Sequence, residues 1–294
     1  MCLLAIAIGA SARWPLVIAS NRDEYRDRPT LPLAVWTTSG DVTVVSGRDL
    51  RAGGTWLGST TGGRIALLTN VREPDAAAAA LSRGELPLRW LAGQMNAAQF
   101  LADTDAMSYG GCNLVIGDFL HGEWTWASNR ANANVGAAPL NSRRTTSGWQ
   151  TMPLPPGVYG LSNALLDTPW PKTQALKAAM TRALTQADAD GDAAVLANLL
   201  WPALGNSKRA ALHDLPSTGV ATALEHALSS ALIDMPERGE SGYGTRSSTL
   251  MWIAAETTSS ALSATVCEKT RTAEGQKAGD ANEQMVRLAW SLRG

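Results

Sequence analysis

The sequence predicts an α+β protein, and three observations point to that class. Short apolar runs bounded by glycine, proline or polar residues recur along the chain, as strands of a layered sheet do. The helical segments come in pairs between groups of such runs. Because helices do not alternate with single strands, α+β layering is favoured over a doubly wound parallel sheet. We expect the 294 residues to form one domain, residues 1–294.

The predicted strands begin with a hairpin. Residues 2–8 and 16–20 are apolar runs, and the short connection between them contains glycine and proline. Residues 139–157 carry four prolines and are predicted to be a surface excursion. Further strands are predicted at 42–46, 55–59, 65–69, 113–117, 124–127, 158–162, 249–254, 261–267 and 284–290, and helices at 81–91, 97–102, 170–184 and 193–204.

No metal site is predicted. The acidic residues around Gly191 resemble part of a calcium loop, but Leu199 stands where the closing glutamate belongs. We therefore interpret this stretch as the connection between two helices. The three histidines, His121, His213 and His226, show no metal-ligand spacing.

Composition and charge limit the classes of function. A net charge of −1 argues against a nucleic-acid-binding protein. Three widely spaced cysteines without a CxxC pair argue against a zinc cluster and fit a reducing compartment. The apolar opening run is too short for a membrane span and lacks a basic start. We expect a cytoplasmic protein that is not integral to the membrane, and the alanine run at 76–80 suggests a GC-rich bacterial source. The oligomeric state is not predicted.

Cys2 is the residue that most directly suggests chemistry. Removal of Met1 would leave a thiol and a free α-amine on one residue. Because the amine titrates near ~8 and the thiol near ~8.5, the amine can serve as the general base for the thiol. An N-terminal thiol or hydroxyl of this kind supports acyl transfer. The alternative is that Cys2 is a small, buried apolar residue.

A polar cluster, Asn21, Arg22, Asp23 and Glu24, follows the second predicted strand. The hairpin would bring this cluster beside Cys2. An acidic group there could hold the α-ammonium, and Arg22 could lower the thiol pKa or grip a carboxylate substrate. The alternative is a solvated turn.

Three further residues at strand ends are candidates for a catalytic site. Asn70 and Asn163 each end a predicted strand, where an amide can stabilise an oxyanion or cap a turn or helix. Arg246 precedes a strand and could anchor an anion or form a surface salt bridge. Trp56 and Trp170 adjoin these clusters and could line a substrate groove, or they could belong to the core.

These motifs resemble the NRDE family, the family of the transport and Golgi organisation protein 2. The matching stretches run in family order along nearly the whole chain. They are Met-Cys at 1–2, Asn-Arg-Asp-Glu at 21–24, residues 53–58, 68–70, 113–114, 159–166 and 168–170, and Tyr-Gly-Thr-Arg at 243–246.

The resemblance implies an N-terminal nucleophile hydrolase fold, a four-layer αββα sandwich of two antiparallel sheets. Its layout is similar to that of the cysteine acylases that cleave bile-salt amides and penicillin V. Carried over by position, Cys2 is the nucleophile, Asn70 and Asn163 are the two assisting amides, and Arg246 is the later arginine.

The tetrapeptide departs from the pattern of those acylases. Asn21 stands where they have arginine, and Glu24 stands where they have aspartate. Arg22 and Asp23 could substitute, but neighbouring strand residues point to opposite faces. A functional exchange would therefore need a bulge or a turn.

Two functions follow from these inferences. The first is a cysteine amidohydrolase that cleaves a non-peptide C–N amide bond of a small or acylated substrate and needs no cofactor. The second, implied by the family, is a non-enzymatic carrier of haem or of acyl-coenzyme A and lipid, in which Cys2 could ligate the haem iron. A structural role without a small-molecule pocket is a third alternative.

Overall fold

The computed structural model describes residues 2–74, 79–130, 139, 141–255, 261–271 and 282–291. The chain divides into two compact units that are interleaved in sequence. Unit 1 comprises Met1–Arg28, Pro156–Leu161 and Asp167–Gly294, and unit 2 comprises Pro29–Pro155 and Ser162–Leu166. Each unit contains one antiparallel sheet with helices packed on it. Two antiparallel sheets accompanied by helices confirm the predicted α+β class.

The sheet of unit 1 has the strand order β11-β1-β2-β13-β14-β15, and β12 pairs with β13. The predicted hairpin is confirmed, because β1 and β2 pair along the whole of β1 with Cys2 opposite Arg22. The strands are β1 (Cys2–Ile8), β2 (Leu16–Tyr25), β11 (Gly157–Leu161), β12 (Asp234–Met235), β13 (Tyr243–Ala255), β14 (Ala261–Thr270) and β15 (Asn282–Ser291).

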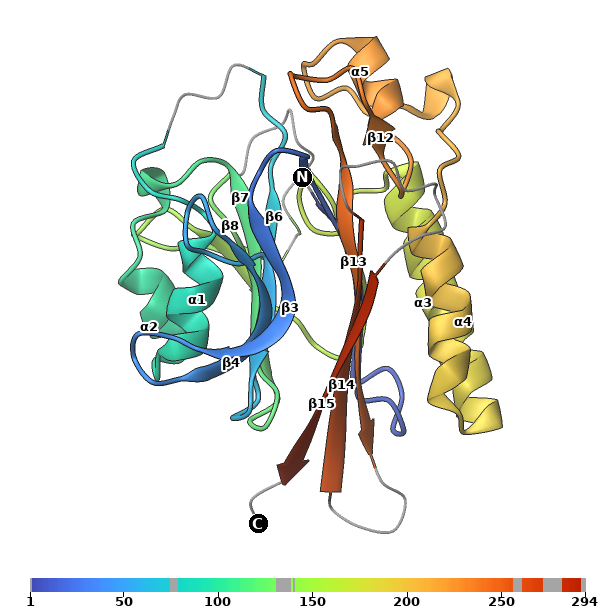
Figure 1. Cartoon of the computed structure of the whole chain (residues 1–294). Helices are drawn as coiled ribbons and strands as arrows, with labels where there is room; N and C mark the ends of the chain where they lie inside the picture. Colours follow the sequence, from blue (N-terminus) through green and yellow to red (C-terminus); the bar gives the residue numbers. More distant parts are fainter. Residues whose placement is uncertain are drawn as a thin grey trace. The chain divides into compact units, whose positions relative to one another are not determined.

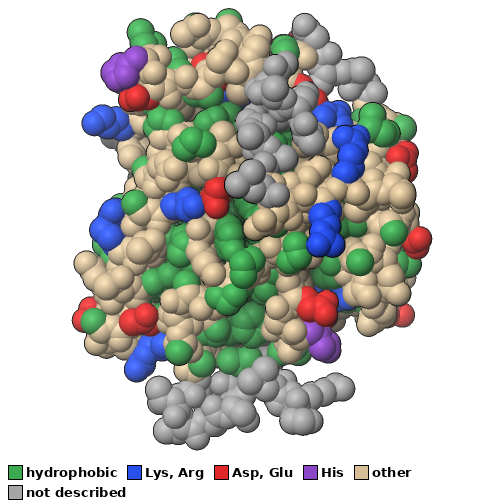
Figure 2. All heavy atoms as spheres, turned by 180° about the vertical axis from the view of Figure 1, so that it is seen from behind, with side chains coloured by type: hydrophobic (Ala, Val, Ile, Leu, Met, Phe, Trp, Pro, Cys, Tyr) green, Lys and Arg blue, Asp and Glu red, His purple; other side chains and the backbone are tan. Residues whose placement is uncertain are grey.

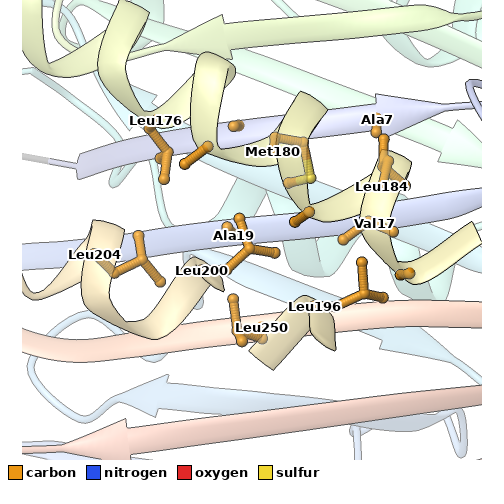
Figure 3. Packing of buried hydrophobic residues seen from close by; sticks show 14 of the residues in the cluster. Ala7, Val17, Ala19, Leu176, Met180, Leu184, Leu196, Leu200, Leu204 and Leu250 are labelled. Atoms are coloured by element: carbon orange, nitrogen blue, oxygen red, sulfur yellow. The ribbon is translucent and has the colours of Figure 1, made fainter. Parts of the chain in front are cut away.

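One face of this sheet packs against α3 (Pro171–Asp190) and α4 (Ala193–Leu204), which run side by side (Figure 1). Alternate strand residues such as Val17 and Leu250 meet Leu200 and other helix residues in one apolar core (Figure 3). Because strand side chains alternate, the residues between them lie on the second face of the sheet. The short helix α5 (Thr222–Ala227) also belongs to unit 1.

The acidic stretch around Gly191 joins α3 to α4. Gly191 ends α3 in the left-handed conformation, with φ of 68°, and its N–H donates to the carbonyl of Ala187. The Asp192 side chain accepts from the backbone N–H of Ala194 and so caps α4. A glycine after one helix and an aspartate before the next are the usual residues at these positions. The interpretation of this stretch as a helix connection is confirmed.

The sheet of unit 2 has the strand order β3-β4-β5-β6-β7-β8-β10-β9. Its strands are β3 (Thr30–Thr37), β4 (Thr43–Asp49), β5 (Leu57–Thr60), β6 (Arg64–Asn70), β7 (Cys112–Asp118), β8 (Glu123–Ser128), β9 (Arg143–Arg144) and β10 (Gln150–Pro153). The helices are α1 (Glu85–Ala92) and α2 (Ala97–Ala102). Single 3-10 turns lie at Ala106–Ser108 in unit 2 and at Leu212–Asp214 in unit 1.

The core of unit 2 is built around Trp90 of α1. Its ring meets Phe100 of α2 edge-on, with 5.6 Å between the ring centroids. On another side, the Arg64 guanidinium lies 3.6 Å from the ring centroid of Trp90. The Arg64 Nε donates to the Trp90 carbonyl at 2.9 Å, and Nη2 donates to the Met95 carbonyl at 2.8 Å. Arg64 therefore joins β6 to the end of α1 by charge, stacking and hydrogen bonds.

The two glycines at 53 and 54 serve different purposes. Gly53 has φ of +71°, and a Cβ added to it would meet no atom within 4 Å. At Gly54 an added Cβ would lie 2.3 Å from the carbonyl carbon of Gly84. This approach lets the Thr55 N–H donate to the Gly84 carbonyl at 2.9 Å. Gly53 is thus needed for backbone conformation, and Gly54 is needed for space.

Several elements differ from the sequence prediction. The excursion at 139–157 contains β9 and β10, and β10 pairs with β8 while its proline stands at the strand end. The edge strand β3 was not predicted, although it contains the apolar run 33–36; its Pro32 is tolerated because the strand lies at the edge of the sheet. In β2 and β13 the polar stretches 21–24 and 243–248 lie inside the strands rather than beside them. Apolar runs mark only the part of a strand whose side chains are apolar.

Candidate functional site

Cys2, Arg22 and Ser247 form a row across three neighbouring strands of unit 1. Cys2 pairs with Arg22 between β1 and β2, and Arg22 pairs with Ser247 between β2 and β13. Directly opposed residues of antiparallel strands carry their side chains on the same face. The three are 7%, 5% and 4% exposed. Their face is the one turned away from α3 and α4, because the alternating residues, such as Leu3, pack against those helices.

Cys2 lies among groups that shift the pKa of its thiol in both directions. Burial raises the pKa of the Cys2 thiol above its ordinary value. The positive charge of Arg22 and a hydrogen bond with the Asp23 backbone act in the opposite direction. A nucleophilic thiolate at this position therefore needs a base to take its proton, and Arg22 is placed to stabilise the thiolate as it forms.

Asp23 lies on the other face of β2, toward the helices. Its Oδ1 accepts a hydrogen bond from the Thr245 hydroxyl at 2.7 Å, and the side chain is 1% exposed. Burial raises the pKa of Asp23, while the nearby Lys172 ammonium acts to lower it. Lys172 is itself buried and donates to the Leu228 carbonyl at 2.9 Å. Asp23 thus belongs to a buried polar group between β2, β13 and the first turn of α3.

Asn21 also faces the helices. Its Nδ2 donates to the carbonyl of Leu204, the last residue of α4, and to the carbonyl of Ala231, both at 2.9 Å. The side chain is fully buried. The last carbonyls of a helix have no partner within the helix, so the Asn21 amide supplies one of them. In this position Asn21 ties two distant segments of unit 1 to strand β2.

A bulge in β13 places Arg246 beside the row. Thr245 pairs with Asp23 and Ser247 pairs with Arg22, so Arg246 is the extra residue. Thr245 lies on the helix side, and so does Ser248, which is opposite Asn21. Arg246 and Ser247, which lie between Thr245 and Ser248 in the sequence, therefore lie on the face that carries Cys2. The sequence indicated only that an exchange of roles within the tetrapeptide would need a bulge or a turn, and the bulge lies in the strand opposite.

Arg246 is held by backbone carbonyls. Its Nη1 donates to the carbonyls of Tyr25, Arg26 and Arg28 at 2.9, 2.8 and 3.2 Å. Its buried Nε has no hydrogen-bond partner among the described residues. Burial lowers the pKa of Arg246, and the like charge of Arg22 acts in the same direction. The two guanidinium groups are therefore close enough to repel each other.

Glu24 supplies the negative charge next to these arginines. Its Oε2 lies 3.8 Å from Arg22 Nη2 and 3.8 Å from Arg28 Nε. Glu24 is 22% exposed, so water screens both ion pairs in part. One carboxylate is thus shared between two guanidinium groups.

The two asparagines predicted as assisting amides lie together in unit 2. The Asn163 Nδ2 donates to the carbonyl of Asn70 at 2.9 Å, and the Asn163 carbonyl accepts from the Arg72 N–H at 2.8 Å. Asn163 is fully buried. This contact joins residues that are 93 positions apart in the sequence.

The two predicted tryptophans are both buried and lie in different units. Trp56 is 8% exposed in unit 2, and its ring fills the space that a side chain at Gly47 would take. Trp170 is 7% exposed and precedes the first residue of α3 in unit 1. The predicted site residues in unit 1 are thus Cys2, Asn21, Arg22, Asp23, Glu24, Trp170 and Arg246, and those in unit 2 are Trp56, Asn70 and Asn163.

Ser247 is the member of the row to which the sequence assigned no role. Serine is common in strands and loops, so its residue type carries no signal. The register with Arg22 depends on the bulge, which the sequence does not reveal. Met1, whose removal the sequence hypothesis requires, lies outside the described residues.

Charged side chains on the face that Figure 2 shows are scattered among uncharged ones. Among the described residues, no three histidine, cysteine, aspartate or glutamate side chains gather as a metal site. No helix in the described part of the chain combines the length and apolar character of a membrane span.

These features define a class: an α+β protein of two antiparallel sheets whose first strand opens with cysteine beside an Asn-Arg-Asp-Glu segment. The family model described as "Transport and Golgi organisation 2" matches residues 1–272, and the chain belongs to this family. The family resemblance predicted from the motifs is confirmed.

Individual proteins are similar to the chain at moderate identity. A mouse "Transport and Golgi organization 2 homolog" is 33% identical over 179 residues, which is 59% of each chain. The human homolog is 30% identical over 250 residues, covering 82% of this chain and 83% of the human protein. A solved structure of a Caenorhabditis elegans N-acylethanolamine-hydrolyzing acid amidase ortholog matches 85% of this chain and 92% of its own, with 11% identity and a TM-score of 0.46.

Proposed function

We propose that the protein is an amidohydrolase in which Cys2, exposed as the first residue by removal of Met1, attacks a non-peptide C–N amide bond. The observation that carries the proposal is the row of Cys2 and Arg22 on one face of the unit 1 sheet. A nucleophilic sulfur and a buried cation side by side suit a reaction in which negative charge forms on the sulfur.

The first half of the reaction forms a thioester. The Cys2 thiol gives its proton to the α-amine of the same residue, and the sulfur bonds to the amide carbon. When the C–N bond breaks, the resulting ammonium returns the proton to the leaving amine. Burial raises the thiol pKa and so opposes this transfer, whereas the charge of Arg22 acts to lower that pKa and favours it. The α-amine, with a pKa near ~8, is the base beside the thiol.

The second half releases the acid. The α-amine takes a proton from water, the oxygen attacks the thioester carbon, and the C–S bond breaks to regenerate the thiol. The Arg22 guanidinium stabilises the sulfur each time it carries charge. The roles of Asn70 and Asn163 as donors to the oxyanion, and of Asp23 and Glu24 in holding the ammonium, stay predictions. So do substrate contacts by Asn21, Trp56 and Trp170.

The test combines intact mass with labelling. We expect the purified protein to lack the mass of Met1 and to form a covalent adduct at Cys2 with an electrophilic amide. The adduct and any amide hydrolysis should disappear in Cys2→Ala. Cys112→Ala, which alters another buried cysteine, is the matched control and should behave as the unaltered protein. Retention of Met1, or labelling that survives Cys2→Ala, would refute the mechanism.

The carrier function for haem or acyl-coenzyme A stays a prediction, as do a cytoplasmic location and a bacterial source. Titration with haem provides the test. A Soret band that is lost in Cys2→Ala would support the carrier function, and the absence of a band at equimolar haem would contradict it.

A further inference from the structure

We propose that Arg22, Arg246 and Ser247 form an anion subsite beside Cys2, which receives a carboxylate carried by the amide substrate. The naming of the substrate class rests on the proposed amidohydrolase function. The subsite itself rests on the geometry of β2 and β13 alone.

The first argument is the bulge. It puts two consecutive side chains, Arg246 and Ser247, on the face that carries Cys2 and Arg22. A regular strand would have turned one of them toward the helices. The bulge therefore gathers two guanidinium groups and a hydroxyl around one position of the sheet.

The second argument is the lack of acceptors. The Ser247 hydroxyl is buried, and its Oγ has no hydrogen-bond partner among the described residues. The same holds for the buried Nε of Arg246. Buried polar groups in folded proteins are normally hydrogen-bonded, so unpaired donors on one face indicate a missing acceptor.

The third argument is charge. Arg22 and Arg246 are close enough for their charges to interact, and Glu24 is shared between Arg22 and Arg28. The charges of Arg22 and Arg246 thus repel each other, and an anionic ligand beside them would reduce that repulsion. A carboxylate fits the planar guanidinium group through paired hydrogen bonds and has room for a further bond from a hydroxyl.

The fourth argument is distance from the nucleophile. Neighbouring strands are spaced by roughly 4.8 Å, so Arg22 lies one spacing from Cys2 and Ser247 lies two. A carboxylate separated from the scissile carbon by a short linker reaches this region. The inferred substrate is a small amide with an acid group close to the bond that is cleaved.

Alkylation of Cys2 tests the subsite without knowledge of the natural substrate. The probes are chloroacetylglycine, which carries a carboxylate, and chloroacetylglycinamide, which is neutral and otherwise matched. The ratio of the alkylation rates of Cys2 by the anionic and the neutral probe is measured by peptide mass spectrometry. It is divided by the same ratio for free cysteine, which corrects for the intrinsic reactivity of the probes. We expect about a tenfold preference for the anionic probe. A ratio of one would overturn the proposal, and a stronger preference for the corresponding phosphonate would overturn the assignment to a carboxylate.

Serine variants give the matched comparison. Ser247→Ala should reduce the preference about fivefold. Ser59→Ala should leave it unchanged, because Ser59 is an equally buried serine in unit 2 whose Oγ also has no partner among the described residues. An equal effect of both variants would overturn the proposal.

A stability measurement decides the matter even where no probe reacts. Ser247→Asp places a carboxylate among the donors and should raise the thermal midpoint, whereas Ser59→Asp buries an uncompensated charge and should lower it. Equal destabilisation would overturn the subsite. Failure of both probes to label Cys2, together with stabilisation by Ser247→Asp, would refute the proposed nucleophile and leave the subsite intact.

Discussion

Replacement of Asn21 by alanine is expected to destabilise unit 1 by about 3 kcal/mol. The Asn21 amide donates to two carbonyls, those of Leu204 and Ala231, and the side chain is fully buried. Each buried carbonyl that loses its donor costs roughly 1–3 kcal/mol. The variant leaves two such groups, which gives a summed range of roughly 2–6 kcal/mol, and about 3 kcal/mol lies in the lower half of that range.

Thermal unfolding followed by circular dichroism measures this loss. For a chain of this length, about 3 kcal/mol corresponds to a decrease of roughly 5 °C in the midpoint. Asn206→Ala is the control, because Asn206 follows α4 but is exposed, and its loss should change the stability by less than about 0.5 kcal/mol. A loss below about 1 kcal/mol for Asn21→Ala would refute the reasoning. The Cys2 alkylation rate of the folded variant should stay within about twofold, because Asn21 lies on the opposite face.

Three further variants test other parts of the structure. In urea unfolding, Gly53→Ala should lower the unfolding free energy by ~1 kcal/mol, and Gly54→Ala should lower it by several times as much. The added methyl group meets open space at Gly53 but lies 2.3 Å from backbone at Gly54. Equal losses for the two variants would contradict this distinction. Burial raises the pKa of Asp23, so its contribution to stability falls as pH rises from the unfolded value of ~3.9 through the folded value. The unfolding free energy of Asp23→Asn should therefore increase relative to that of the unaltered protein as the pH rises from 4 to 8. A difference that stays constant over this range would contradict the reasoning. Arg64→Lys keeps the charge but loses the planar contact with Trp90, and a decrease of about 1–2 kcal/mol in unfolding free energy is expected, whereas no change would show that the stacking is unimportant.

The local parts of the fold could be predicted from the sequence. Two apolar runs with a short connection containing glycine and proline specify the β1–β2 hairpin, and antiparallel pairing then brings Cys2 next to the tetrapeptide. The connection between α3 and α4 was predicted from its glycine and acidic residues. In each case the interacting residues are close in sequence, and their conformational preferences are strong.

The non-local parts could not be derived in this way. Asn21 binds backbone carbonyls at 204 and 231, and a carbonyl has no residue type that would mark it. The position of Ser247 depends on one extra residue in β13, and a bulge shifts register without any change in composition. The contact of Asn163 with Asn70 follows from chain topology. Only the family resemblance grouped these two asparagines.

The alternation of side chains along β2 divides the Asn-Arg-Asp-Glu segment into two pairs with different tasks. Asn21 and Asp23 are turned to the interior beneath the helices, whereas Arg22 and Glu24 share the side of the sheet that bears the thiol. Substitutions at odd and even positions should thus give two phenotypes in a mutational scan. Changes at 21 would lower the amount of protein that accumulates, and changes at the partly exposed position 24 would leave the amount normal while altering reactivity.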